Sequence, residues 1–204
     1  EDLKATRPAL DEQLSITWLV YDSSPIDLAA GLDSQDVWSL PIRGAAHRSD
    51  QQRYPASVVK LAYAMAVEQW LARDLLLDSP ELRRAMQDMI GDSSNDATSL
   101  VMDLLSGTTS GPELPPDPFS SWARQRQLVN QWFASLGWPE WQGSNACQKT
   151  WGEGPYGRER QFYGAEMENR NRLSTDITAR MLHAVLTGAW VSPLASARLR
   201  DLLS

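Results

Sequence analysis

The chain has 204 residues, of which 42% are hydrophobic and 22% are charged, with a formal net charge of −7. This composition is that of a globular domain with one core, and it excludes a disordered or collagen-like chain. The acidic balance argues against nucleic-acid binding, which needs clustered Lys and Arg. No apolar run approaches the about 20 residues of a membrane span, so we expect none. The lone Cys147 cannot form an internal disulfide.

Two strands are predicted near the N-terminus. Residues 15–22 are rich in β-branched and aromatic side chains and predict a buried strand. A second strand is expected at 37–42, after a loop at 31–36, and the two should pair as a hairpin. Because a two-stranded ribbon is rarely stable alone, we expect further strands, from sequence beyond this chain, to complete the sheet.

From Ser57 onward the pattern is helical. Serines at N-cap positions, prolines in first turns and terminal glycines predict helices at 57–72, 80–90, 95–105, 120–136, 174–186 and 193–203. The segment between 138 and 172 holds no convincing long element, and a loop of that length is typical of a functional region. We therefore expect one mixed α+β domain over residues 1–204, with a sheet lobe (1–50), a helical lobe (51–190) and a return helix (191–204).

The helix that begins at Ser57 contains the first candidate catalytic residues. Residues 54–67 are apolar on every side of a helix, which predicts burial, and Lys60 is their only charge. Burying an unpaired ammonium is unfavourable, so this lysine must be paired, neutralised or used. One helical turn separates it from Ser57, so its amine can reach the hydroxyl as the base of a serine nucleophile. Alternatively, Ser57 caps the helix and Lys60 extends to solvent.

A second polar motif, Ser93-Ser94-Asn95, lies in the turn between two predicted helices. Ser93 can act as a proton relay toward the Ser57/Lys60 pair, and Asn95 can bind Lys60 or a substrate amide. Its structural alternative is a helix N-cap formed by Ser94 or Asn95.

Together, S-x-x-K opening a buried helix and S-x-N opening a later one resemble the penicillin-binding protein and β-lactamase superfamily, most closely class A β-lactamases. Residues 53–61 and 172–182 are similar to the family's nucleophile segment and to the helix after its omega loop. The resemblance runs from about residue 15 to the end of the chain. It implies a helical lobe packed against an antiparallel sheet.

The resemblance also implies a role for each motif residue. Ser57 would attack the carbonyl of a β-lactam or D-alanyl amide, Lys60 would act as base and Ser93 would pass a proton to the leaving nitrogen. Asn95 would bind the substrate amide. An acyl-enzyme would then await water.

Three family features differ in this chain. Ser94 stands where class A enzymes usually have Asp, as in many D,D-peptidases. The omega-loop pattern E-x-x-x-N has no match, and Glu153, Glu159 and Glu166 are the candidate carboxylates on the substrate side. The K-T-G strand is missing, because Lys149-Thr150-Trp151 precedes the omega-like region and cannot be that strand by order. We expect the segment that carries it to be absent from this chain.

Two other functions stay open. One is a D,D-peptidase acting on peptidoglycan peptides. The other is a non-catalytic homologue that binds a glycan or a protein through Trp138, Trp141 and Trp151. His47 and His183 have no neighbouring ligands at metal-binding spacing, so no zinc and no cofactor are expected. We expect a monomer. The resemblance implies a small β-lactam or peptidoglycan-like substrate and action outside the cytoplasm, in the periplasm or secreted.

Overall fold

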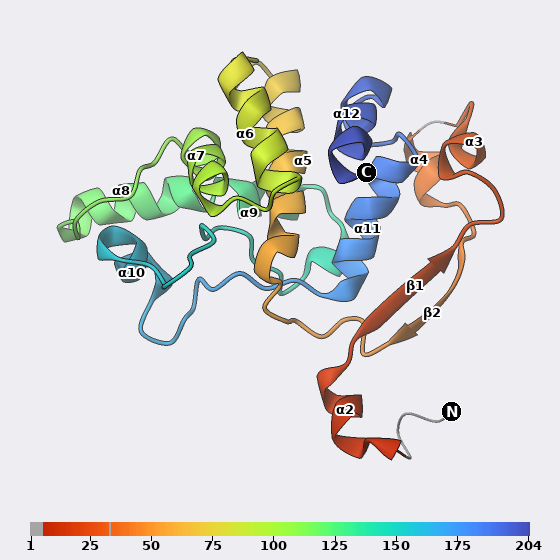
Figure 1. The fold of residues 1–204 in the computed structure, drawn as a ribbon, viewed down its shortest axis with the longest axis horizontal. Coiled ribbons are helices and arrows are strands. Elements are labelled where there is room, and N and C mark those ends of the chain that lie inside the picture. The colour runs from red at the N-terminus through yellow and green to blue at the C-terminus, as the bar shows by residue number, and fades with distance from the viewer. Residues whose placement is uncertain (1–5, 33) are drawn as a thin grey trace.

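The computed structural model describes residues 6–32 and 34–204 as a mixed α+β protein, in which a helical body carries a β-ribbon at one end (Figure 1). The strands are β1 (Ile16–Val20) and β2 (Arg43–His47). The N-terminal helices are α2 (Pro8–Gln13), α3 (Pro25–Ala29) and α4 (Ser34–Trp38). The later elements are η1 (Ala56–Val58), α5 (Val59–Ala72), α6 (Pro80–Ile90), α7 (Asn95–Ser106), α8 (Pro116–Arg126), α9 (Leu128–Ser135), η2 (Pro139–Trp141), α10 (Gly157–Tyr163), α11 (Thr175–Leu186) and α12 (Pro193–Leu203).

The sheet is the antiparallel pair β1–β2, with Ile16 opposite His47 and Val20 opposite Arg43. The first predicted strand is confirmed as a strand, but the expectation that it is buried is wrong, because Ile16 is 43% exposed and Trp18 is 64% exposed. The prediction of a second strand at 37–42 and a loop at 31–36 is also wrong. That apolar run belongs to α4 and the turn after it, since a short apolar run does not distinguish a strand from a buried helix. The true second strand contains Gly44, where a Cβ atom would lie 2.3 Å from the Trp18 carbonyl oxygen.

The core is built around α5, which contacts α6, α7 and α12. Most of its side chains are buried, as its apolar sequence predicts. The predicted helices at 80–90 and 193–203 are confirmed as α6 and α12, and those at 95–105 and 174–186 match α7 and α11 to within one residue at either end. The predicted helix at 120–136 is wrong in detail: it starts earlier, and a break at Gln127 divides it into α8 and α9.

Capping serines set the start of four helices, because each accepts a hydrogen bond from an amide in the first turn. These are Ser79 (3.2 Å to Leu82 N), Ser94 (3.1 Å to Ala97 N), Ser174 (3.2 Å to Ile177 N) and Ser192 (3.1 Å to Ala195 N). None of the helices in the described ranges has the length and hydropathy needed to cross a bilayer.

Candidate active site

Ser57 lies in the short helix η1, which continues directly into α5. Its side chain is exposed, whereas that of Lys60, one turn further on, is only 2% exposed. The segment before Ser57 is fixed by two backbone hydrogen bonds of 3.0 Å between Arg53 and Leu173. Neither η1 nor α5 uses Ser57 as its N-cap residue. Helix capping therefore does not account for a serine at this position.

Lys60 joins the first motif to the second. Its Nζ atom donates to the Ser93 carbonyl oxygen at 2.5 Å, to Ser93 Oγ at 3.0 Å and to Asn95 Oδ1 at 3.1 Å. Lys60 and Ser93 are 33 residues apart in the sequence. The S-x-x-K and S-x-N motifs thus meet at one ammonium group. Lys60 does not extend to solvent, and Ser94, between the two contact residues, caps α7.

The hydrogen bonds of Lys60 correspond to its charged form. An ammonium has three N–H donors, and the second motif provides three acceptors. None of the described contacts joins Lys60 to Ser57. Burial lowers the pKa of Lys60 below its ordinary value of 10.5, because desolvation disfavours the ammonium. A lysine with a lowered pKa can lose a proton at a pH where an exposed lysine cannot, as a catalytic base requires.

Backbone strain coincides with both motifs. Ala56, immediately before Ser57, has φ 46°, and Ser93 has φ 54°. A positive φ is unfavourable for a residue with a Cβ atom and persists where the surrounding structure demands it. Such strain is concentrated at active sites and ligand clamps. Here one such residue directly precedes the candidate nucleophile, and the other is the residue whose carbonyl and hydroxyl oxygens both contact Lys60.

The long segment predicted as a functional loop is closed at its base. Asn145 and Arg172 exchange two backbone hydrogen bonds of 2.8 Å. Asn171 Oδ1 accepts from the backbone N–H of Gln148 at 2.9 Å. The Tyr63 hydroxyl on α5 donates to the backbone carbonyl oxygen of Gln148 at 2.5 Å. Because Tyr63 lies one turn beyond Lys60 on α5, this loop is anchored beside the candidate site.

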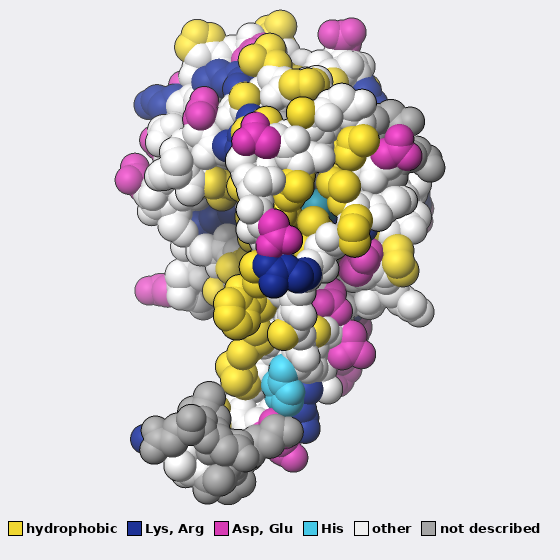
Figure 2. All heavy atoms as spheres, turned by 90° about the vertical axis from the view of Figure 1, so that its right-hand side faces the viewer, with side chains coloured by type: hydrophobic (Ala, Val, Ile, Leu, Met, Phe, Trp, Pro, Cys, Tyr) yellow, Lys and Arg dark blue, Asp and Glu magenta, His cyan; other side chains and the backbone are white. Residues whose placement is uncertain are grey.

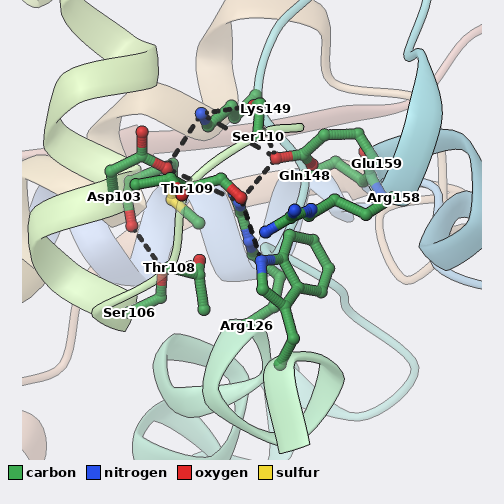
Figure 3. Close-up of polar contacts among 12 residues, drawn as sticks. Asp103, Ser106, Thr108, Thr109, Ser110, Arg126, Gln148, Lys149, Arg158 and Glu159 are labelled. Carbon is green, nitrogen blue, oxygen red and sulfur yellow. Dashed lines mark hydrogen bonds and ion pairs between the residues drawn. The ribbon is translucent and has the colours of Figure 1, made fainter. Parts of the chain in front are cut away.

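The interior of the loop contains a buried ion network, drawn in Figure 3. Glu159 of α10 is fully buried and accepts from Arg126 at 2.6 Å and from the Ser110 hydroxyl at 2.9 Å. Lys149 lies 2.8 Å from Asp103 on α7 and 3.8 Å from Glu159. The network connects α7 and α8 to the loop and holds the loop against the helical body.

Comparisons with known proteins add no relative. No protein-family model, curated protein or solved structure matches this chain. The family resemblance therefore depends on the two motifs and on their geometry.

None of the hydrogen bonds described for the three candidate glutamates involves the Lys60 cluster, which consists of Lys60, Ser93 and Asn95. Glu159 bonds within the ion network, while Glu153 is exposed and accepts only from the Tyr156 hydroxyl, at 3.5 Å, among the described hydrogen bonds. Glu166 is exposed. Lys149, the first residue of the Lys-Thr-Trp sequence, is buried in the same network and contacts Asp103 and Glu159.

Tyr63, Asn171 and Arg126 were not predicted as site-supporting residues. They act through contacts between distant segments, and no local spacing in the sequence indicates such contacts. Within the described residues, no group of three His, Cys, Asp or Glu side chains could hold a metal ion. What the site offers is an exposed hydroxyl, a buried amine with a lowered pKa, a second hydroxyl and an amide.

Proposed function

We propose that this chain is a serine hydrolase that forms an acyl-enzyme through Ser57 with β-lactams or related amides. The observation that carries the proposal is the buried Lys60 ammonium, hydrogen-bonded to both Ser93 and Asn95. The exposed Ser57, one turn before it, completes the set of groups that acyl transfer needs.

In the proposed reaction, Lys60 first loses its proton. The neutral amine then takes the proton of Ser57 as its Oγ atom bonds to the substrate carbonyl carbon. When the carbon–nitrogen bond breaks, Ser93 gives its proton to the leaving nitrogen and regains one from Lys60, to which it is already hydrogen-bonded at 3.0 Å. Asn95 holds the substrate amide. Water then hydrolyses the ester on Ser57.

The same proposal includes the β-lactamase and D,D-peptidase type of fold, with β1 and β2 as part of its sheet and with action outside the cytoplasm. Its support is the order of elements: a ribbon, a buried helix opened by S-x-x-K, S-x-N before α7, a loop, and the helix α11.

A D,D-peptidase acting on peptidoglycan peptides is the second candidate. It is favoured by the contacts of Glu159, which belongs to the ion network with Arg126 and Lys149. Among the described contacts no carboxylate is bonded to Lys60 or Ser93, so no such contact holds a carboxylate beside the acylation pair. On this ground we expect the acyl-enzyme to decay slowly.

The test is the intact mass of the protein after incubation with a penicillin. We expect a gain equal to the drug, and peptide mapping should locate it on Ser57. Rapid disappearance of the adduct with release of hydrolysed drug indicates a lactamase, and an adduct that lasts for hours indicates a peptidase. A protein that stays unmodified with both penicillin and a D-alanyl-D-alanine peptide thioester would contradict both.

The rate of adduct formation should rise with pH. The reactive form of Lys60 is the neutral amine, and burial lowers the pKa of this lysine from 10.5. The neutral fraction therefore grows as pH rises through that lowered pKa, and reaches its plateau below the pH at which an exposed lysine would. Stopped-flow measurement of the acylation rate between about pH 5 and 10 tests this, because that range includes the pKa values at which lysine acts as a general base. A rate that falls over this range would contradict the role of Lys60 as base.

A further inference from the structure

A largely apolar cavity lies between the N-terminal helices and the turn that joins α11 to α12, on elements separate from the Lys60 cluster. Its volume is about 430 Å³. Small-molecule sites have volumes of this order and are mostly apolar, with a few placed polar groups. Figure 1 shows α3 and α4 next to the chain that joins α11 to α12, and Figure 2 looks onto this side of the molecule, where hydrophobic side chains lie between charged ones.

Apolar side chains form most of the cavity wall. They include Ile26, Ala29, Leu32 and Val37 on one side, and Val191 and Pro193 on the other. Three of these large side chains are left partly open to solvent, since Ile26 is 45% exposed, Leu32 40% and Val191 36%. A Cβ atom on Gly188, which also lines the cavity, would meet no described atom within 4 Å. An apolar ligand would therefore enter unfilled space and cover apolar surface that now faces water.

The backbone of Val191 is strained. Its φ of 56° lies in the left-handed region, where a β-branched residue is a true outlier. The turn holds this conformation although the Val191 side chain remains 36% exposed at the cavity, so core burial does not account for it. Backbone strain of this kind is concentrated at functional sites and ligand clamps. The strain therefore supports a ligand contact at this turn.

Arg200 on α12 is the one charged side chain among the described residues that line the cavity. Its Nη1 atom donates to the Val185 carbonyl oxygen at 2.9 Å, which holds the guanidinium at the end of α11. Within the described residues Arg200 makes no ion pair. Its Nε and Nη2 atoms are not among the buried atoms without a partner, so both are open to contact from outside the protein. The cation is thus held in place and can pair with an incoming anion.

The charge and the shape of the cavity limit the chemistry of its ligand. Its two hydroxyl side chains are already bonded within the protein, because Thr187 donates to the His183 carbonyl oxygen at 2.7 Å and Ser192 accepts from the Ala195 amide at 3.1 Å. A sugar would find few partners, and a cation would face Arg200. An aliphatic chain with one carboxylate suits both the apolar wall and the guanidinium. At about 30 Å³ per water-sized group, the cavity holds roughly fourteen such groups, about the size of a ten-carbon fatty acid.

We infer that this cavity binds a medium-chain fatty acid, with its hydrocarbon chain against the apolar wall and its carboxylate on Arg200. The inference is independent of the proposed function of Ser57, because it uses none of the residues of the Lys60 cluster and its test involves no acylation.

The test is NMR of protein labelled at the isoleucine δ1-methyl groups. The chain has five isoleucines. Ile26 lines the cavity, whereas Ile90 ends α6 and does not. We expect decanoate, kept below its micelle concentration, to shift the Ile26 signal, assigned by Ile26→Val, and to leave that of Ile90 in place. No shift at Ile26 with about millimolar decanoate, or equal shifts of both signals, would overturn the inference.

Two further probes separate the charge from the hydrocarbon chain. Decanol keeps the chain and lacks the charge, so it should bind at least about tenfold more weakly than decanoate, the loss expected for one charged hydrogen bond. Butyrate keeps the charge on a much shorter chain and should bind at least about a hundredfold more weakly. Decanol that binds as tightly as decanoate would contradict the role of Arg200, and equal binding of butyrate would contradict that of the apolar wall.

Variants of Arg200 add a second test. Arg200→Gln should weaken decanoate binding by at least about tenfold and leave decanol binding unchanged, whereas a distorted cavity would bind both more weakly. Arg200→Lys keeps a cation and should keep the preference for decanoate. Arg84→Gln is the matched control, because Arg84 is exposed on α6 and pairs with Glu81. Unchanged decanoate affinity in Arg200→Gln would contradict the site. If Arg200→Gln does not fold, loss of the preference for decanoate in Arg200→Lys would contradict it equally.

Discussion

Replacing Lys60 with methionine should slow acylation by penicillin by about 10²–10⁴-fold, the usual contribution of a positioned general base. Methionine keeps the apolar stem in the core and removes only the amine. Ser93 and Asn95 lose their contact with the ammonium, but both residues are exposed, so water can replace it. The variant should therefore fold, since a cation that is only 2% exposed has been removed from the interior. Quench-flow mass spectrometry measures the rate.

The control for this prediction is Ser57→Ala, which should give no adduct at any time because it lacks the attacking oxygen. Ser23→Ala, at another exposed serine, should acylate like the parent protein. The Lys60→Met variant should also lose the rise of the rate with pH. A methionine variant that acylates at the parental rate would show that Lys60 is a structural cation and that another group activates Ser57.

Much of the helical body could be predicted from the sequence because its signals are local. Ser79 followed by Pro80 marks the start of α6, and Ser192 followed by Pro193 marks that of α12. The apolar surround of Lys60 predicted its burial. The meeting of Lys60 with Ser93 and Asn95 was a hypothesis drawn from the two motifs, and the hydrogen bonds place these three residues together.

The second strand could not be predicted for a physical reason. β2 reads Arg-Gly-Ala-Ala-His, with low strand propensity, and most of its side chains are exposed. Its position is set by pairing with β1, and Gly44 is required by the close approach of Trp18. Of the apolar residues that predicted a strand at 37–42, Val37 at the end of α4 is buried, and Trp38, Leu40 and Ile42 are partly buried by tertiary packing.

The ion network was equally hidden from sequence reasoning. Glu159 pairs with Arg126, 33 residues away on α8. Such a contact exists only once the loop has folded back on α7 and α8. Its members can be recognised by burial, which a single sequence does not reveal.

Replacing Arg126 with methionine should lower the free energy of unfolding by about 3–5 kcal/mol, the usual effect of leaving a buried charge without its partner. Arg126 and Glu159 are both fully buried and lie 2.6 Å apart. Without the guanidinium, Glu159 keeps only the Ser110 hydroxyl and Lys149 at 3.8 Å, and that lysine is already paired with Asp103. Urea denaturation followed by Trp fluorescence gives the value.

The matched control is Arg124→Met, two residues earlier on α8, whose side chain is exposed and donates to Ser120 and Ser121. Its effect should stay below about 1 kcal/mol, as for other exposed polar contacts. The double variant Arg126→Met/Glu159→Met should recover most of the lost stability, because it removes the unpaired charge together with its partner. If the double variant has a lower free energy of unfolding than Arg126→Met, then an unpaired Glu159 charge is not what destabilises the single variant. That result would contradict the buried-charge explanation.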